Sequence, residues 1–115
     1  MEQPRFEFLN RESRPDMIEA LRAYATRRLS FATRRFEGRI RNVMVRLADL
    51  NGRKRGVDSR CSISVDLIDG RHLFVHATTP WPFASLTKAA SRLNSVLRRE
   101  FDRSAWQRNN DPETA

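Results

Sequence analysis

The sequence predicts a small α+β domain with the element order β-α-β-β-β-α, in which a four-stranded mixed sheet carries two helices packed on one face. Four short segments alternate apolar and polar side chains, which is typical of strands with one covered face. Two longer segments repeat apolar residues at the helical period, and two helices of their length suffice to cover such a sheet. A chain of 115 residues has room for a single core.

The first strand is expected at residues 5–9, where RFEFL alternates, and a long helix at residues 15–36. Ser13 and Asp16 suit a capping box, Pro15 suits the first helical turn, and Gly38 is expected to end the helix. The apolar stripe expected to face the core comprises Ile18, Leu21, Ala25, Leu29, Ala32 and Phe36.

The opposite side of this helix is basic and aromatic and carries no acid. Its residues are Tyr24, Arg27, Arg28, Phe31, Arg34 and Arg35. Guanidinium groups suit phosphates, and Tyr24 or Phe31 is available to stack on an unpaired base. The alternative interpretation is a solvated helix face, which is the usual role of exposed charge.

A second strand is expected at residues 40–47, followed by a polar loop at residues 49–60 that contains two glycines. Arg53, Lys54 and Arg55 lie at the centre of this loop. Three adjacent cations repel one another and gain most when an anion neutralises them, so we expect them to contact RNA, with solubility as the alternative role.

A hairpin follows, with a turn at Asp69 and Gly70. The residues expected to face the core are Cys61, Ile63, Val65, Leu67, Leu73, Val75 and Ala77. Those expected on the other face are His72, Phe74 and His76, beside Ser64 and Asp66. Cys61 is the only cysteine, so it is expected to be a buried thiol.

Asp66, His72 and His76 are the one group that suggests catalysis or metal binding, but two imidazoles without a third strong ligand are a weak signal. No Ser/His/Asp order, glycine-rich phosphate loop or closely paired carboxylates accompany them. We therefore predict no enzyme, catalytic residue, metal site, cofactor or small-molecule substrate. The alternative is an enzyme or metal protein built on these three residues.

The second helix is expected to begin near Pro82 and to end near Arg103. Its apolar residues are Phe83, Leu86, Ala90, Leu93, Leu97 and Phe101, and its far side carries Lys88, Arg92, Arg99 and Arg103. If the two helices lie side by side, their basic stripes should merge into one surface.

The charge balance points to a polyanionic partner. The chain has 22 basic and 14 acidic residues, a formal charge of +8 and a pI near 11.3. Only Lys54 and Lys88 are lysines, which favours forked contacts to phosphate, although a GC-rich genome would produce the same bias. Without an apolar run of about 20 residues or a signal peptide, the protein is expected in the cytoplasm and not in a membrane.

The chain resembles a known family through EALRAYATRRLSFATRRFEGRIRNVMVRL, the basic loop, VDLIDGRHLFVHA and PFASLTKAASRLNSVLRRE, in this order. The family is that of the ribosome hibernation-promoting factors, also called ribosome-associated inhibitors or sigma-54 modulation proteins. The resemblance implies the fold predicted above and binding to small-subunit ribosomal RNA near the decoding centre. It also implies that the protein blocks the path of messenger and transfer RNA, so that resting ribosomes stay silent.

The resemblance also implies which residues bind RNA. The basic positions of the family match Arg27, Arg28 and Arg34 in the first helix and Arg92, Arg98 and Arg99 in the second. The chain departs from the family pattern at Phe31, where a lysine is usual, at Ser95, which is commonly basic, and in the opening of the second helix.

Residues 1–104 are expected to form a single ribosome-binding domain, followed by a polar, flexible tail at residues 105–115. Long members of the family add a module that pairs ribosomes, and no such dimerisation domain is expected here. The expected partner is the small ribosomal subunit with its RNA. Two alternatives remain open: a stand-alone regulator that binds structured RNA, and a basic module for an acidic protein.

Overall fold

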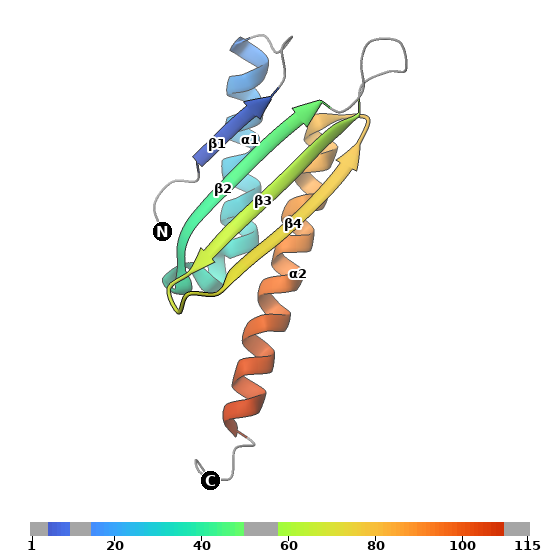
Figure 1. Cartoon of the computed structure of the whole chain (residues 1–115). Helices are drawn as coiled ribbons and strands as arrows, with labels where there is room; N and C mark the ends of the chain where they lie inside the picture. Colours follow the sequence, from blue (N-terminus) through green and yellow to red (C-terminus); the bar gives the residue numbers. More distant parts are fainter. Residues whose placement is uncertain (1–4, 10–14, 50–57, 110–115) are drawn as a thin grey trace.

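The computed structural model describes residues 5–9, 15–49 and 58–109, and it shows a four-stranded mixed sheet with two helices. The elements are β1 (Arg5–Leu9), α1 (Pro15–Thr33), the 3₁₀ helix η1 (Arg34–Arg39), β2 (Ile40–Asp49), β3 (Ser59–Leu67), β4 (His72–Thr79) and α2 (Pro82–Asn109). The strand order is β1-β2-β3-β4, with β1 parallel to β2 and the other pairs antiparallel (Figure 1). The predicted fold class is confirmed.

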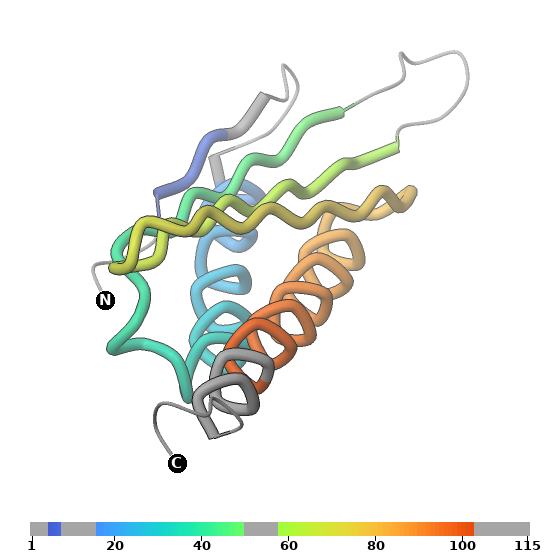
Figure 2. The backbone as a smooth tube through the Cα atoms, turned by 60° about the horizontal axis from the view of Figure 1, so that its bottom comes forward, coloured from blue at the N-terminus to red at the C-terminus, as the bar shows by residue number. Residues whose placement is uncertain are grey.

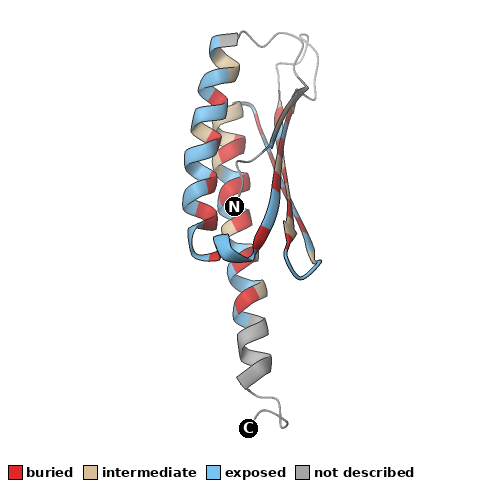
Figure 3. Cartoon of the chain, turned by 90° about the vertical axis from the view of Figure 1, so that its left-hand side faces the viewer, coloured by how far each residue is buried: buried red, intermediate tan, exposed pale blue. Residues whose placement is uncertain are grey.

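Both helices lie on the same face of the sheet, and the other face is open to solvent (Figures 2 and 3). The core fills the space between these two layers. In β3, the side chains of Cys61, Ile63, Val65 and Leu67 are buried, and they meet Leu86, Leu93 and Leu97 of α2 in one apolar cluster. The predicted core face of each hairpin strand is therefore correct, because alternation fixes which side chains share a face.

The first helix ends earlier than predicted. Its α-helical part stops at Thr33, and the 3₁₀ helix runs through Gly38, which has no left-handed conformation. At this end the Ala32 carbonyl, one of the last four of the helix, accepts a hydrogen bond from Asn94 Nδ2 of α2 at 2.9 Å, and Thr33 Oγ1 donates to Leu29 O one turn back at 2.7 Å. The tighter 3₁₀ turn follows, and Phe36 is buried against Phe101 with the ring centroids 5.2 Å apart.

The second helix ends later than predicted. It begins at Pro82 as expected but continues to Asn109, past the end expected near Arg103. The first helix breaker after Arg103 is Pro112, so nothing in the local sequence stops the helix earlier. The predicted cap at Ser13 and the basic loop residues Arg53, Lys54 and Arg55 lie outside the described residues.

The turn between β3 and β4 uses Gly70 as predicted. Gly70 adopts φ +93°, a conformation that favours glycine. Asp69 Oδ1 accepts a hydrogen bond from the Arg71 main-chain N–H at 3.0 Å, and this bond is the main cause of the lowered pKa of Asp69. The register then pairs Asp66 with His72 and Ser64 with Phe74, so the predicted neighbours on the open face are confirmed.

Cys61 is a buried thiol in β3, as expected, and burial raises its pKa to about 12. Within the described ranges, no helix is long and apolar enough to cross a membrane.

Candidate nucleic-acid interface

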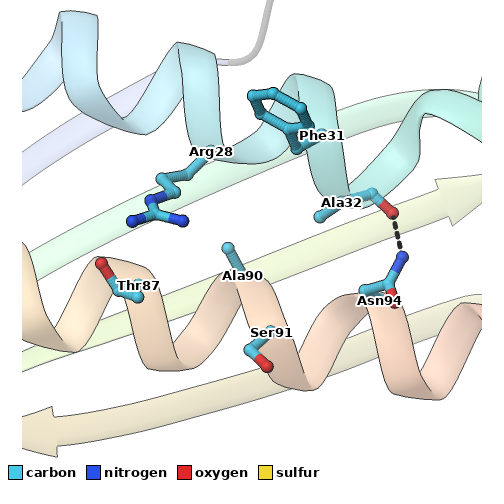
Figure 4. A pocket seen from close by; sticks show the side chains of 7 residues that line it. All are labelled: Arg28, Phe31, Ala32, Thr87, Ala90, Ser91 and Asn94. Carbon is cyan, nitrogen blue, oxygen red and sulfur yellow. Dashed lines mark hydrogen bonds between the residues drawn. The ribbon is translucent and has the colours of Figure 1, made fainter.

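A groove runs between the outer sides of α1 and α2 (Figure 4). Arg28 and Phe31 come from α1, and Thr87, Ser91 and Asn94 come from α2. The helices approach closely because Ala32 and Ala90, which also line the groove, are small. The groove thus places a guanidinium and an aromatic ring beside neutral hydrogen-bonding side chains.

A chain of hydrogen bonds joins the two helices at one end of the groove. Arg28 Nε donates to Tyr24 Oη at 3.1 Å, Tyr24 bonds to Thr87 Oγ1, and Thr87 donates to the Phe83 carbonyl at 3.0 Å. The bond to Thr87 is the main cause of the lowered pKa of Tyr24, and the charge of Arg28 contributes. This chain fixes Arg28 at the entrance of the groove.

Tyr24 and Phe31, the two predicted stacking residues, lie in different environments. Tyr24 is half-buried, with its ring edge-on to Phe83 at 5.2 Å between centroids and the Arg28 guanidinium 5.3 Å from its ring centroid. Phe31 is 74% exposed. Because the Tyr24 ring already packs within the protein, Phe31 is the better placed of the two to meet a base.

Arginine side chains surround Phe31. Arg27 and Arg34 share a shallow pocket with Ser30 and Phe31, and Arg27 and Arg28 share a second one with Tyr24. Glu37 also lines the first pocket. The sequence interpretation missed this acid because Glu37 lies beyond the predicted helix, in η1.

None of the described basic residues of α2 lines the groove between the helices or the pockets around Phe31. Lys88, Arg92, Arg98 and Arg99 are all exposed, but Arg92 and Arg99 line a different groove, between α2 and β4. The two grooves share Ser91 as a lining residue, and the merging of the two basic stripes into one surface stays a prediction. Arg92 and Arg99 lie on the side of α2 that carries the half-buried Val96, which also lines the groove beside β4. The Arg103 side chain lies outside the described part.

Two other arginines are neutralised by ion pairs within the fold. Arg46 pairs with Glu7 at 2.9 Å, and Arg71 pairs with Asp69 at 2.9 Å and Glu100 at 3.0 Å. Within the described residues, the predicted RNA-binding cations form no ion pair: Arg27, Arg28, Arg34, Arg35, Lys88, Arg92, Arg98 and Arg99. These cations of the helices are thus available to an anion, as are exposed arginines of the sheet such as Arg41 and Arg60.

The two histidines do not form a cluster that could hold a metal. His72 Nδ1 lies 2.6 Å from Asp66 Oδ1, and this hydrogen bond is the main cause of the lowered pKa of Asp66. His76 instead contacts the Phe74 ring, at 5.9 Å between centroids. No three histidine, cysteine or acidic side chains gather anywhere in the part of the chain that the structure describes.

Replacing Tyr24 by phenylalanine is expected to lower the free energy of unfolding by about 1 kcal/mol, because one partly buried hydrogen bond between the helices is lost. Urea unfolding measures this change. Thr26→Val is the matched control, since Thr26 Oγ1 donates only to Arg22 O of its own helix, and this bond is exposed. Equal effects of the two substitutions would contradict a stabilising role of the bond from Tyr24 to Thr87.

A sequence profile of the family described as "Sigma 54 modulation protein / S30EA ribosomal protein" matches residues 15–105. Among solved structures, the N-terminal domain of Protein Y from Thermus thermophilus is similar, with a TM-score of 0.64, 23% sequence identity, and coverage of 86% of this chain and 98% of that chain. A ribosomal subunit interface protein from Coxiella burnetii gives a TM-score of 0.63 at 13% identity, covering 85% of this chain and 96% of that one. No curated protein sequence matches this chain.

Proposed function

Because the chain belongs to the sigma 54 modulation protein / S30EA ribosomal protein family, we propose that it is a hibernation factor that binds small-subunit ribosomal RNA through the outer surface of α1 and α2. The family consists of ribosome-associated factors, not of enzymes. In this proposal the bound protein occupies the path of messenger and transfer RNA. Inhibition is then steric, and it ends when the protein dissociates.

The observation that carries the proposal is the set of unpaired cations around an exposed aromatic ring. Arg27, Arg28 and Arg34 border Phe31, and none of them forms an ion pair with a described residue. Contacts to phosphate position a protein on RNA, and stacking recognises unpaired bases. Folded ribosomal RNA offers both features.

The remaining predicted RNA contacts belong to the same proposal. They are Arg35, Lys88, Arg98, Arg103 and the loop residues Arg53, Lys54 and Arg55. The ribosome-binding domain is proposed to span residues 1–104, with residues 105–115 as a tail, and the protein is proposed to act in the cytoplasm without pairing ribosomes itself.

Binding to the small subunit is expected to weaken steeply with salt. If about six phosphates are neutralised, counterion release gives a log-log slope of about −4 to −5, so each doubling of the monovalent salt weakens binding about 16- to 32-fold. Cosedimentation at constant magnesium concentration measures this slope. A slope near zero would exclude phosphate contacts as the main source of affinity.

The experiment that tests the proposed function is cosedimentation with purified small subunits, with and without messenger and transfer RNA. Saturable one-to-one binding that competes with transfer RNA is the expected result. Binding that does not saturate, or that is no tighter than binding to free structured RNA, would contradict the proposal and favour a general RNA-binding regulator.

A further inference from the structure

We infer that α2 and the edge strand β4 form a second RNA site, which takes one unpaired nucleotide with its base on Phe74 and its phosphate on Arg92 and Arg99. The inference rests on the proposed function only in that the ligand is RNA. The groove of this site, of about 390 Å³, shares Ser91 with the groove between the helices, but Arg92, Arg99 and Phe74 line only this second groove.

The apolar part of the site is an exposed ring. Phe74 is 56% exposed, although its neighbours Leu73 and Val75 on the same strand are buried in the core. The His76 ring lies beside it, with centroids 5.9 Å apart and the planes tilted by 45°. Two neighbouring rings at a sheet edge offer a stacking platform, and stacking on aromatic side chains is the sequence-tolerant way in which proteins hold unpaired bases.

The charged part of the site lies on α2, which covers the other face of the sheet, so the two parts meet only at the open edge of β4, where residues of both elements line the groove. Arg92 donates a hydrogen bond to the His76 carbonyl, which fixes its guanidinium over the strand edge and leaves most of its donors free. Arg99 lines the same groove, together with Ser91 and Ser95, and no carboxylate lies among the described residues that line it. A ligand that offers both a flat ring and a negative charge fits this combination, and a nucleotide has both.

The main chain of β4 adds a reason to expect an unpaired base. The His76 carbonyl accepts a hydrogen bond from Arg92 of α2, so it points away from β3. In an antiparallel strand the main-chain N–H and C=O groups of every second residue point to the same side, and Phe74 is two residues before His76. The N–H and C=O of Phe74 therefore face the open edge, where they can bond to a base. In a duplex these base edges are already paired, so the site should prefer single strands.

An NMR titration of the full chain with the single strand U8 tests the inference. We expect shifts of the Phe74, His76 and Ser95 amides, and a loss of affinity of at least about fivefold for Phe74→Thr, because the stacking on this ring is removed. Phe74→Tyr should bind U8 within about twofold of the original chain, since its ring still stacks. Ile68→Thr is the matched control, because Ile68 is 57% exposed but lies in the β3–β4 turn, outside the groove.

Several outcomes would overturn the inference. Shifts confined to Arg28, Phe31 and Asn94 would assign all RNA binding to the groove between the helices, as would equal affinities of Phe74→Thr and Ile68→Thr. Equal shifts at Phe74 with a decaglutamate peptide would assign the groove to an acidic protein segment instead. A different result would contradict the proposed function. If the protein does not cosediment with small subunits but Phe74→Thr still weakens binding to U8, the ribosomal function is wrong and the second RNA site stands.

Discussion

Replacing Arg27 and Arg34 together by glutamate is expected to weaken binding to the small ribosomal subunit at least about 100-fold. Both side chains border Phe31 in the same shallow pocket, and neither forms an ion pair within the described residues. Each substitution removes a charged hydrogen-bond donor and places a carboxylate beside the phosphate that the arginine is proposed to contact. Glu37, which already lines this pocket, adds to the repulsion.

Binding isotherms from cosedimentation at low salt measure the loss. The matched control is the double variant Arg41→Glu with Arg60→Glu, which changes the net charge by the same amount. Arg41 and Arg60 are exposed on β2 and β3, in the sheet and away from the pocket around Phe31. If the control loses as much affinity as the first variant, binding depends on net charge alone and the proposed surface is wrong.

The strands and their faces could be predicted from the sequence because alternating apolar and polar residues indicate directly which side chains are buried. Cys61, Ile63 and Val65 are buried, while Ser62 and Ser64 between them are only partly covered. Because side chains alternate between the two faces of a strand, only one choice of the core face buries all the apolar residues. The same argument placed His72, Phe74 and His76 on the exposed side of β4.

The end of the first helix could not be predicted, because the deciding contact comes from far away in the sequence. Asn94 of α2 donates to the Ala32 carbonyl, and the stacked pair of Phe36 and Phe101 lies just beyond. Gly38 was the only local stop signal, and the 3₁₀ helix passes through it. Tertiary contacts here outweigh the local preference.

The candidate site was only partly predictable for a related reason. The net charge of the sequence does not distinguish arginines that form ion pairs from those that do not. Arg71 is neutralised by Asp69 and Glu100, whereas Arg34 forms no ion pair within the described residues. Helical spacing put Arg92 on the outer side of α2. Only the position of β4 shows that Arg92 meets the His76 carbonyl, which separates it from the groove between the helices.

The second large effect concerns stability: Leu93→Ala is expected to lower the free energy of unfolding by about 3 kcal/mol. Leu93 is fully buried in the middle of α2, in the same cluster as Leu29 of α1 and Val65 of β3. Alanine has a slightly higher helix propensity than leucine, so the loss comes from packing and from the cavity left behind, not from the helix itself. About 3 kcal/mol is a large part of the stability of a domain of this size.

Urea unfolding followed by circular dichroism measures the change, with Ile68→Ala as the control. Ile68 is 57% exposed in the β3–β4 turn, so removing a similar amount of aliphatic side chain there is expected to change stability by less than about 0.5 kcal/mol. Equal losses for the two variants would mean that the middle of α2 does not pack against α1 and the sheet. Since α2 carries residues of both proposed RNA sites, the placement of one groove beside α1 and the other beside β4 would then have no structural basis.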